Sequence, residues 1–215
     1  MSSDDPKTLN IGVLASGGGS NLQSIIDACE TGEIPGRVVV VISNNSSAKA
    51  LERAGRHGID AVHLSNYHYP DDEELDQAIV EVLRNGGVEL VCLAGYMKKR
   101  GPRLIKAFPN RILNIHPALL PRYGGKGMYG VRVHEAVLAA GDKVSGVSVH
   151  LVDELYDHGP IVAQREVPVL PDDTPETLAA RVLKVEHEIY PEVIAGVARG
   201  DINLDDIVEK SRNQD

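Results

Sequence analysis

Residues 9–31 read LNIGVLASGGGSNLQSIIDACET, a pattern that recurs in looser form through the first half of the chain. Residues 9–15 are almost wholly apolar, as expected of a strand that is buried on both faces of a sheet. Glycines follow, and apolar residues then recur at the spacing of one helix face: Leu22, Ile25, Ile26 and Cys29. The stretch predicts a buried strand, a glycine loop and a helix in succession.

The alternation of strand and helix continues downstream. Apolar runs rich in valine predict strands at residues 37–42, 59–64 and 88–94. The intervening segments predict helices at residues 48–57 and 71–85, each followed by glycine. Strands that alternate with helices indicate a parallel, doubly wound sheet.

The second half predicts strands that are joined differently, at residues 112–116, 146–152 and 161–169. The last two are close enough in the chain to pair antiparallel through a turn. Thr174, followed by Pro175, predicts a helix that runs to about Gly200. We expect an α/β, Rossmann-like, mainly parallel sheet with antiparallel strands added in the C-terminal half. One domain is expected over residues 1–215, with loose termini at about 1–8 and 202–215.

Composition and charge narrow the class of protein. The 215 residues are 42% hydrophobic, which is enough for one ordinary core. A net charge of −9 and a pI near 5.4 argue against broad binding to nucleic acids or anionic membranes, although a local basic pocket is allowed. Neither a signal peptide nor a membrane-spanning apolar run is found. Cys29 and Cys92 lack zinc-ligand spacing, so reduced core residues of a cytoplasmic protein are expected.

The glycine loop, residues 15–21 (ASGGGSN), joins the first predicted strand to the first helix. Glycines let backbone N–H groups turn inward, and a helix N-terminus adds partial positive charge. The loop matches neither the dinucleotide fingerprint nor the lysine-bearing loop of nucleoside triphosphatases. It predicts a monophosphate site to which Ser20 and Asn21 add donors. The alternative is a tight turn in which Ser20 caps the helix.

A second candidate site is centred on Asn114 and His116. Side chains two residues apart on a strand point to the same face, so these two residues share a face. The amide could donate to a developing oxyanion, and the imidazole could transfer a proton. The acidic turn at residues 153–160 could add a carboxylate that raises the pKa of His116, and the candidates are Asp153, Glu154 and Asp157. No serine or cysteine stands where it would act as a nucleophile, which favours direct acyl transfer to an amine.

Several alternatives remain at this point. His116 could be a satisfied core histidine and Asn114 a turn former before Pro117. His150 is either a core residue or a support for the site. His63, His68 and His134 are predicted at the surface or in loops. No metal is expected, because no pair of histidines has the spacing of a hydrolytic zinc site on a helix.

Separated segments of the chain resemble the phosphoribosylglycinamide formyltransferases, the folate-dependent enzymes of purine synthesis. The matching segments are residues 16–23 (SGGGSNLQ), 42–44 (ISN), 93–97 (LAGYM), 112–121 (ILNIHPALLP), 146–164 and 186–191 (EHEIYP). They are spread over the chain from Asn10 to about Gly200. The motif at residues 114–121 is shared by folate formyltransferases and deformylases, and the glycine loop is the more discriminating piece.

This resemblance implies transfer of a formyl group from 10-formyltetrahydrofolate to the amine of glycinamide ribonucleotide. Asn114 would contact the formyl oxygen, His116 would be the proton donor, and Asp157 would be the carboxylate that holds up its pKa. The resemblance also implies binding residues: Gly19, Ser20 and Asn21 for the ribose 5-phosphate, Glu186 for the sugar hydroxyls or the glycinamide end, Met97, Lys98, Lys99, Arg100 and Asn114 for the folate, and Asp153 and Glu154 in a loop over the pterin. It implies no metal, nucleic acid or membrane partner, and a monomer or homodimer.

The chain departs from the family pattern in places. Residues 71–74 are acidic where a basic residue is common, Lys98 replaces a common arginine, and His158 replaces a frequent glycine. The segment Gly124–Gly130 is longer than in some relatives and is a candidate gate for substrate. Formyltetrahydrofolate deformylase and methionyl-tRNA formyltransferase are disfavoured because each is expected to carry a further domain. A non-catalytic phosphate- or nucleotide-binding module is the alternative of a different class.

Overall fold

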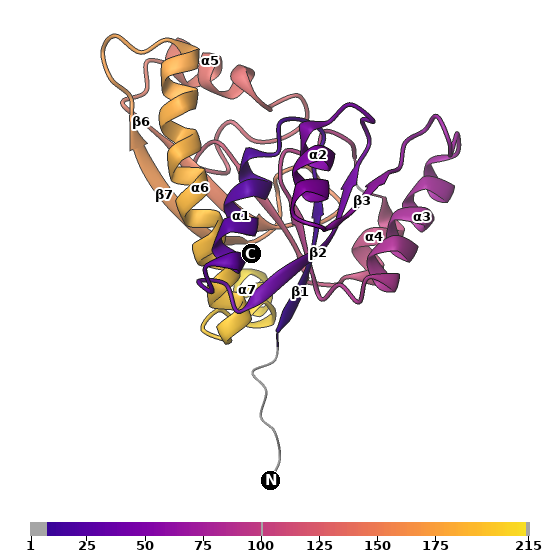
Figure 1. The fold of residues 1–215 in the computed structure, drawn as a ribbon. Coiled ribbons are helices and arrows are strands. Elements are labelled where there is room, and N and C mark those ends of the chain that lie inside the picture. The colour runs from indigo at the N-terminus through magenta and orange to yellow at the C-terminus, as the bar shows by residue number, and fades with distance from the viewer. Residues whose placement is uncertain (1–7, 100, 214–215) are drawn as a thin grey trace.

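A computed structural model describes residues 8–99 and 101–213, and Figure 1 shows its ribbon. A seven-stranded sheet runs through it in the order β3-β2-β1-β4-β5-β6-β7. The strands are β1 Leu9–Leu14, β2 Gly36–Ser43, β3 Asp60–His63, β4 Leu90–Leu93, β5 Ile112–His116, β6 Val144–Leu151 and β7 Ile161–Pro168. The helices are α1 Ser20–Glu30, α2 Lys49–Arg56, α3 Asp72–Asn85, α4 Pro102–Ala107, α5 Val131–Ala139, α6 Pro175–Arg199 and α7 Leu204–Arg212.

The direction of the strands confirms the predicted fold class. The strands β3, β2, β1, β4 and β5 pair parallel with their neighbours. β6 joins β5 antiparallel, and β7 joins β6 antiparallel. The register of β5 and β6 places Asn114 opposite His150 and His116 opposite Ser148. Polar residues of two neighbouring strands therefore meet at one end of the sheet.

The two faces of the sheet are covered by different helices (Figure 1). Along β1, Ile11 and Val13 pack into a core with α1, α2, α6 and α7, whereas Leu14 packs into a second core with α3 and α4. This division follows from the two-residue period of a strand. It explains why residues 9–15 are apolar without a polar alternation.

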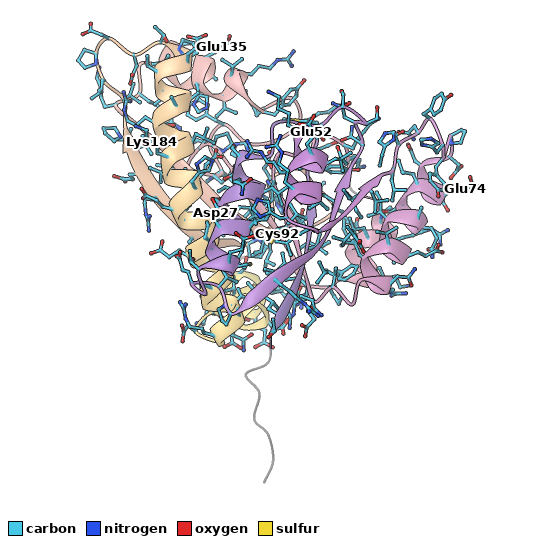
Figure 2. All side chains as sticks on the ribbon, in the orientation of Figure 1. Asp27, Glu52, Glu74, Cys92, Glu135 and Lys184 are labelled. Atoms are coloured by element: carbon cyan, nitrogen blue, oxygen red, sulfur yellow. The ribbon has the colours of Figure 1, made fainter. Side chains whose placement is uncertain are left out.

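The cysteines lie in the first of these cores. Cys92, on β4, is buried near the middle of the fold (Figure 2), and Cys29, on α1, is half-buried. Burial raises the pKa of the Cys92 thiol to about 12, so that thiol is unreactive. The expectation that both are core residues is confirmed.

The C-terminal segment corrects one prediction. Residues 202–215 were expected to be loose, but Leu204–Arg212 forms α7. Asn203 caps it through its side chain, which accepts from the N–H groups of Asp205 and Asp206. Leu204 and Val208 are buried against the core. The predicted loose N-terminus falls on residues 1–7, which lie outside the described residues, and on the exposed Thr8.

The helices α4 and α5 were not predicted either. The long helix α6 begins as expected, with a capping box between Thr174 and Thr177. It ends at Gly200, whose φ of 79° favours glycine. Across residues 8–99 and 101–213, no helix combines the length and apolar character needed to span a membrane.

Candidate active site

A cavity of about 470 Å³ opens at the carboxyl ends of β1, β4 and β5. This is where the strand order reverses between β1 and β4, the position at which open α/β sheets bind ligands. The lining combines the predicted elements, and it includes Asn21 and Glu186, Asn114, His116 and Asp157, and Met97 with the segment Gly125–Gly130.

The glycine loop is shaped by a close approach to α2. Gly19 is the N-cap of α1 and has φ of 69°, in the left-handed region. A Cβ atom on Gly19 would lie 2.9 Å from the Cα and Cβ atoms of Ala50. Both the backbone angle and the contact with Ala50 therefore require glycine. Gly17 and Gly18 have open space at the corresponding position.

The capping alternative for Ser20 does not hold in the structure. Ser20 is the first residue of α1, and the N-cap Gly19 makes no side-chain hydrogen bond. The first N–H groups of a helix have no partner within the helix. With no side-chain cap, this terminus keeps donors and partial positive charge for an anion.

Asn21 and Glu186 form a buried polar pair between α1 and α6. The Nδ2 atom of Asn21 donates to Oε2 of Glu186 at 2.6 Å, and Asn21 Oδ1 has no hydrogen-bond partner. Glu186 is only 8% exposed, so it is not a solvated helix carboxylate. Burial raises the pKa of Glu186, and the bond from Asn21 opposes part of that rise. The pair offers polar atoms to a ligand that enters the cavity.

The Asn114–His116 face carries a third polar residue from the turn between β6 and β7. Oδ2 of Asp157 lies 3.7 Å from Nδ1 of His116, and its Oδ1 lies 3.7 Å from Nε2 of His150. Asn114 Nδ2 is 2.9 Å from Nε2 of His150 and 3.5 Å from Oδ1 of Asp157. His150 therefore supports the amide and the carboxylate from behind.

Of the three candidate carboxylates, Asp157 is the one that lies beside His116. Asp157 lines the cavity, whereas Asp153 pairs with the exposed His158 at 2.8 Å and Glu154 is exposed. Asp157 has φ of 52°, and its Oδ2 accepts from the N–H of Gly125 at 3.0 Å. A Cβ on Gly159 would lie 2.0 Å from the carbonyl oxygen of Leu151, so glycine permits the turn to fold back.

The hydrogen bonds of the histidines assign their protons. His116 Nε2 lies 2.8 Å from the carbonyl oxygen of Tyr123, so this nitrogen must carry a hydrogen. The nitrogen of His116 that can gain or lose a proton is then Nδ1, which faces Asp157. His150 Nδ1 donates to the carbonyl of Leu151 at 2.8 Å, which leaves its Nε2 to accept from Asn114.

The charge state of His116 differs from the sequence-based expectation. Burial lowers the pKa of His116 and outweighs the opposing effects of Asp157 and the Tyr123 carbonyl. Asp157 resists the effect of its own burial: the neighbouring His150 and His116 rings and the N–H of Gly125 together lower the pKa of Asp157. The pair at neutral pH is thus a neutral imidazole beside an ionised carboxylate.

Only some of the residues expected to bind the folate line the central cavity. Met97 lines the cavity, and its N–H donates to Ser16 Oγ at 2.8 Å, which ties it to the glycine loop. Lys98 and Lys99 instead line a neighbouring cavity of about 390 Å³ together with the acidic start of α3. Arg100 lies outside the described residues, and Asp153 and Glu154 do not line the central cavity.

Sequence reasoning missed two contributors near His116. Tyr123 supplies the carbonyl described above, and backbone groups leave no sequence signal. His134 was predicted at the surface but is buried on α5, with its Nδ1 unpartnered. Burial lowers the pKa of His134, and the charge of a protonated His116 lowers it further. Val133 and Val137, buried on the same helix, were the available signal.

Among residues 8–99 and 101–213, no group of three or more His, Cys, Asp or Glu side chains is arranged so that it could hold a metal ion. Polar groups at the cavity are instead paired with one another or with the backbone. The arrangement can bind an anion at one end and move a proton at the other.

Comparison with known proteins supports the same chemistry. Residues 9–194 match the family model described as formyl transferase. The phosphoribosylglycinamide formyltransferase of Haemophilus influenzae is 42% identical over 196 residues, covering 91% of this chain and 90% of that protein. The chloroplastic enzyme of Arabidopsis thaliana is 46% identical over 197 residues, covering 91% of this chain and 68% of that protein.

Solved structures agree in fold. Glycinamide ribonucleotide transformylase 1 from Symbiobacterium toebii superimposes with a TM-score of 0.85 at 50% identity, covering 90% of this chain and 89% of that one. The phosphoribosylglycinamide formyltransferase of Bacillus halodurans gives a TM-score of 0.84 at 37% identity, covering 91% and 98%. The chain therefore belongs to the formyl transferase family, among its phosphoribosylglycinamide formyltransferases.

Proposed function

We propose that this chain transfers the formyl group of 10-formyltetrahydrofolate to the amine of 5′-phosphoribosylglycinamide, giving formylglycinamide ribonucleotide and tetrahydrofolate in de novo purine synthesis. The observation that carries the proposal is that one cavity is lined by both Asn21 and the Asn114–His116–Asp157 group. A substrate with a phosphate at one end and an amine at the other suits such a cavity. Its amine would then lie beside the group that moves a proton.

The ribonucleotide would be held at the α1 end. Gly19, Ser20 and Asn21 offer the uncapped N-terminus of α1 to the 5-phosphate. Glu186, held by Asn21, would accept from a sugar hydroxyl or from the glycinamide end. The buried Oδ1 atom of Asn21 has no hydrogen-bond partner, which supports a ligand site next to Glu186. A buried polar atom without a partner costs free energy, and a ligand that donates to this oxygen would supply the missing hydrogen bond.

The formyl transfer itself would use the proton state of His116. As the substrate nitrogen attacks the formyl carbon, negative charge develops on the formyl oxygen, and the Asn114 amide N–H can donate to it. The neutral His116 Nδ1 takes the proton that leaves the attacking nitrogen, and Asp157 stabilises the imidazolium formed. His116 then donates that proton to the folate nitrogen as its bond to the formyl carbon breaks. One proton has moved from the amine to the folate, and the protein ends unchanged.

The folate would enter past Met97, with Asn114 at the formyl end. Lys98 and Lys99 line the adjoining cavity, where they would contact the acidic tail of the folate rather than its ring. Asp153 and Glu154 would act from the loop over the pterin, and the segment Gly124–Gly130 would gate the cavity. Arg100 and the choice between monomer and homodimer stay as predictions.

The test is an assay that follows folate absorbance with 10-formyltetrahydrofolate in the presence and absence of glycinamide ribonucleotide. We expect product only when both substrates are present, together with formylated ribonucleotide by mass spectrometry. Equal rates without the ribonucleotide would favour a deformylase. No turnover under either condition would favour a phosphate-binding module without catalysis.

A further inference from the structure

The helix α2 packs against the glycine loop and lies beside α1 (Figure 1). The N–H of Ala50 donates to the carbonyl of Gly17 at 3.1 Å. One turn later, Arg53 Nε donates to the carbonyl of Gly18 at 2.9 Å, and its Nη1 donates to Oε1 of Gln23 at 2.9 Å. A single guanidinium thus ties the loop to the first turn of α1.

The bond to Gly18 has a consequence for the next residue. A trans peptide is planar, so its carbonyl and the following N–H point in opposite directions. Holding the Gly18 carbonyl toward Arg53 therefore turns the Gly19 N–H away from Arg53. The direction of one donor of the phosphate loop is set by an arginine that lies behind it.

Arg53 is also a cation whose hydrogen bonds, within residues 8–99 and 101–213, go to the neutral groups of Gly18 and Gln23. In the described ranges, no Asp or Glu side chain is hydrogen-bonded to Arg53, which is half-buried. The positive charge of Arg53 contributes to lowering the pKa of His187, which lies on α6. Arg56, on the next turn of α2, is exposed and pairs with Glu52 at 3.4 Å instead. An uncompensated positive charge beside a helix N-terminus favours a bound anion.

We propose that Arg53 is a positioning residue that determines affinity for the phosphate of the substrate, by orienting the Gly18–Gly19 peptide and by adding positive charge behind the loop. This rests on the proposed function for the identity of the substrate. It applies to any phosphomonoester that binds at the glycine loop. The residue acts through the loop and need not touch the phosphate.

The test compares Arg53→Leu, Arg53→Lys and the matched control Arg56→Leu with the wild type. We expect Arg53→Leu to raise the KM for glycinamide ribonucleotide and the inhibition constant of inorganic phosphate by about 10-fold or more, the scale of a charge-assisted hydrogen bond. The folate KM should stay unchanged, and kcat at saturating ribonucleotide should stay close to that of the wild type. Arg53→Lys should recover part of the loss, because an ammonium keeps the charge without the fork.

A second pair of measurements separates positioning from general loss of structure. With the unphosphorylated glycinamide riboside as acceptor, Arg53→Leu should match the wild type, since no phosphate is bound. Inorganic phosphate should raise the Tm of the wild type and of Arg56→Leu more than that of Arg53→Leu.

Some outcomes would overturn the proposal. These are an unchanged ribonucleotide KM in Arg53→Leu, an equal loss with the riboside, or equal Tm shifts by phosphate in all variants. The Tm readout does not need turnover. If the wild type transfers no formyl group, the proposed function fails, whereas an Arg53-dependent phosphate shift would still support this inference.

Discussion

The Nδ1 atom of His116 lies 3.7 Å from Oδ2 of Asp157, although one residue ends a strand and the other belongs to a turn beyond the next strand. Both side chains are buried, at 4% and 10% exposure. Burial alone would disfavour charge on either group. Asp157 is nevertheless ionised and His116 is neutral. A neutral His116 is the form that can receive a proton from an amine, and the adjacent carboxylate stabilises the imidazolium that results.

Replacing Asp157 tests this relationship. Asp157→Asn keeps the shape of the side chain but removes the charge that stabilises a protonated His116. We expect kcat to fall about 10²- to 10⁴-fold, the usual worth of general acid–base catalysis. Asp153→Asn, which alters a partly buried carboxylate of the same turn, should lower turnover far less. Similar losses in the two variants would contradict the assignment of Asp157.

Glu186 gives a prediction about binding rather than turnover. Glu186→Gln should raise the KM for the ribonucleotide about 10-fold, because a hydrogen bond to a charged or strongly polar acceptor is weakened. Glu188→Gln, two residues along α6 and exposed, is the control and should leave that KM unchanged. Steady-state kinetics with each substrate varied in turn measure the effect. A change in the folate KM alone would place Glu186 outside the ribonucleotide site.

Gly19 gives a prediction about stability. Gly19→Ala forces an L residue into φ of 69° and brings Cβ to 2.9 Å from Ala50, so we expect the free energy of unfolding to fall. A loss of about 1–3 kcal/mol is the usual cost of such a backbone conformation. Gly17→Ala, with open space at Cβ, should unfold close to the wild type. Urea denaturation of both variants measures the difference, and equal midpoints would refute the role given to the contact with Ala50.

His134 predicts a pH dependence of stability. Its pKa in the folded protein lies below the ordinary 6.5, so the unfolded chain binds the proton more readily. The stability that neutral His134 contributes is present above pH 6.5 and is lost as the pH falls through its folded pKa.

The variant His134→Leu isolates this effect. Between pH 7.5 and 5.5 it should lose less free energy of unfolding than the wild type, by at most about 1.4 kcal/mol per pH unit for one proton. The exposed His68 provides the control His68→Leu, which should follow the wild type. Urea titrations at both pH values measure the slopes. Parallel slopes for wild type and His134→Leu would show that His134 does not take up the proton.

Several features of the fold could be predicted because they depend on neighbours in the chain. The apolar run at residues 9–15, the glycine loop and the helix that follows appear as β1, the loop and α1. The proline after Thr174 marked the start of α6 for the same reason. The helix α7 was missed although Leu204, Ile207 and Val208 have helical spacing, because one such group is too short to distinguish from a polar tail.

The candidate site, in contrast, depends on contacts between residues that are far apart in the chain. The local sequence does not distinguish among the carboxylates Asp153, Glu154 and Asp157. The choice depends on the left-handed backbone of Asp157 and on the close packing of Gly159 against Leu151. The buried position of His134 depends on which face of α5 packs against α6. The position of Asp157 has no signature within a few residues, because it arises from contacts between segments far apart in the chain.

By itself, the sequence determined the strand–helix order, the glycine loop and the projection of Asn114 and His116 from one strand face. These follow from backbone geometry and the period of apolar residues, which are local. Only the tertiary structure decided that Asp157 faces His116, that Glu186 is buried against Asn21, and that the pKa of His116 is lowered rather than raised. Burial and charge are sums over everything packed around a group, and the chain must fold before that surrounding exists.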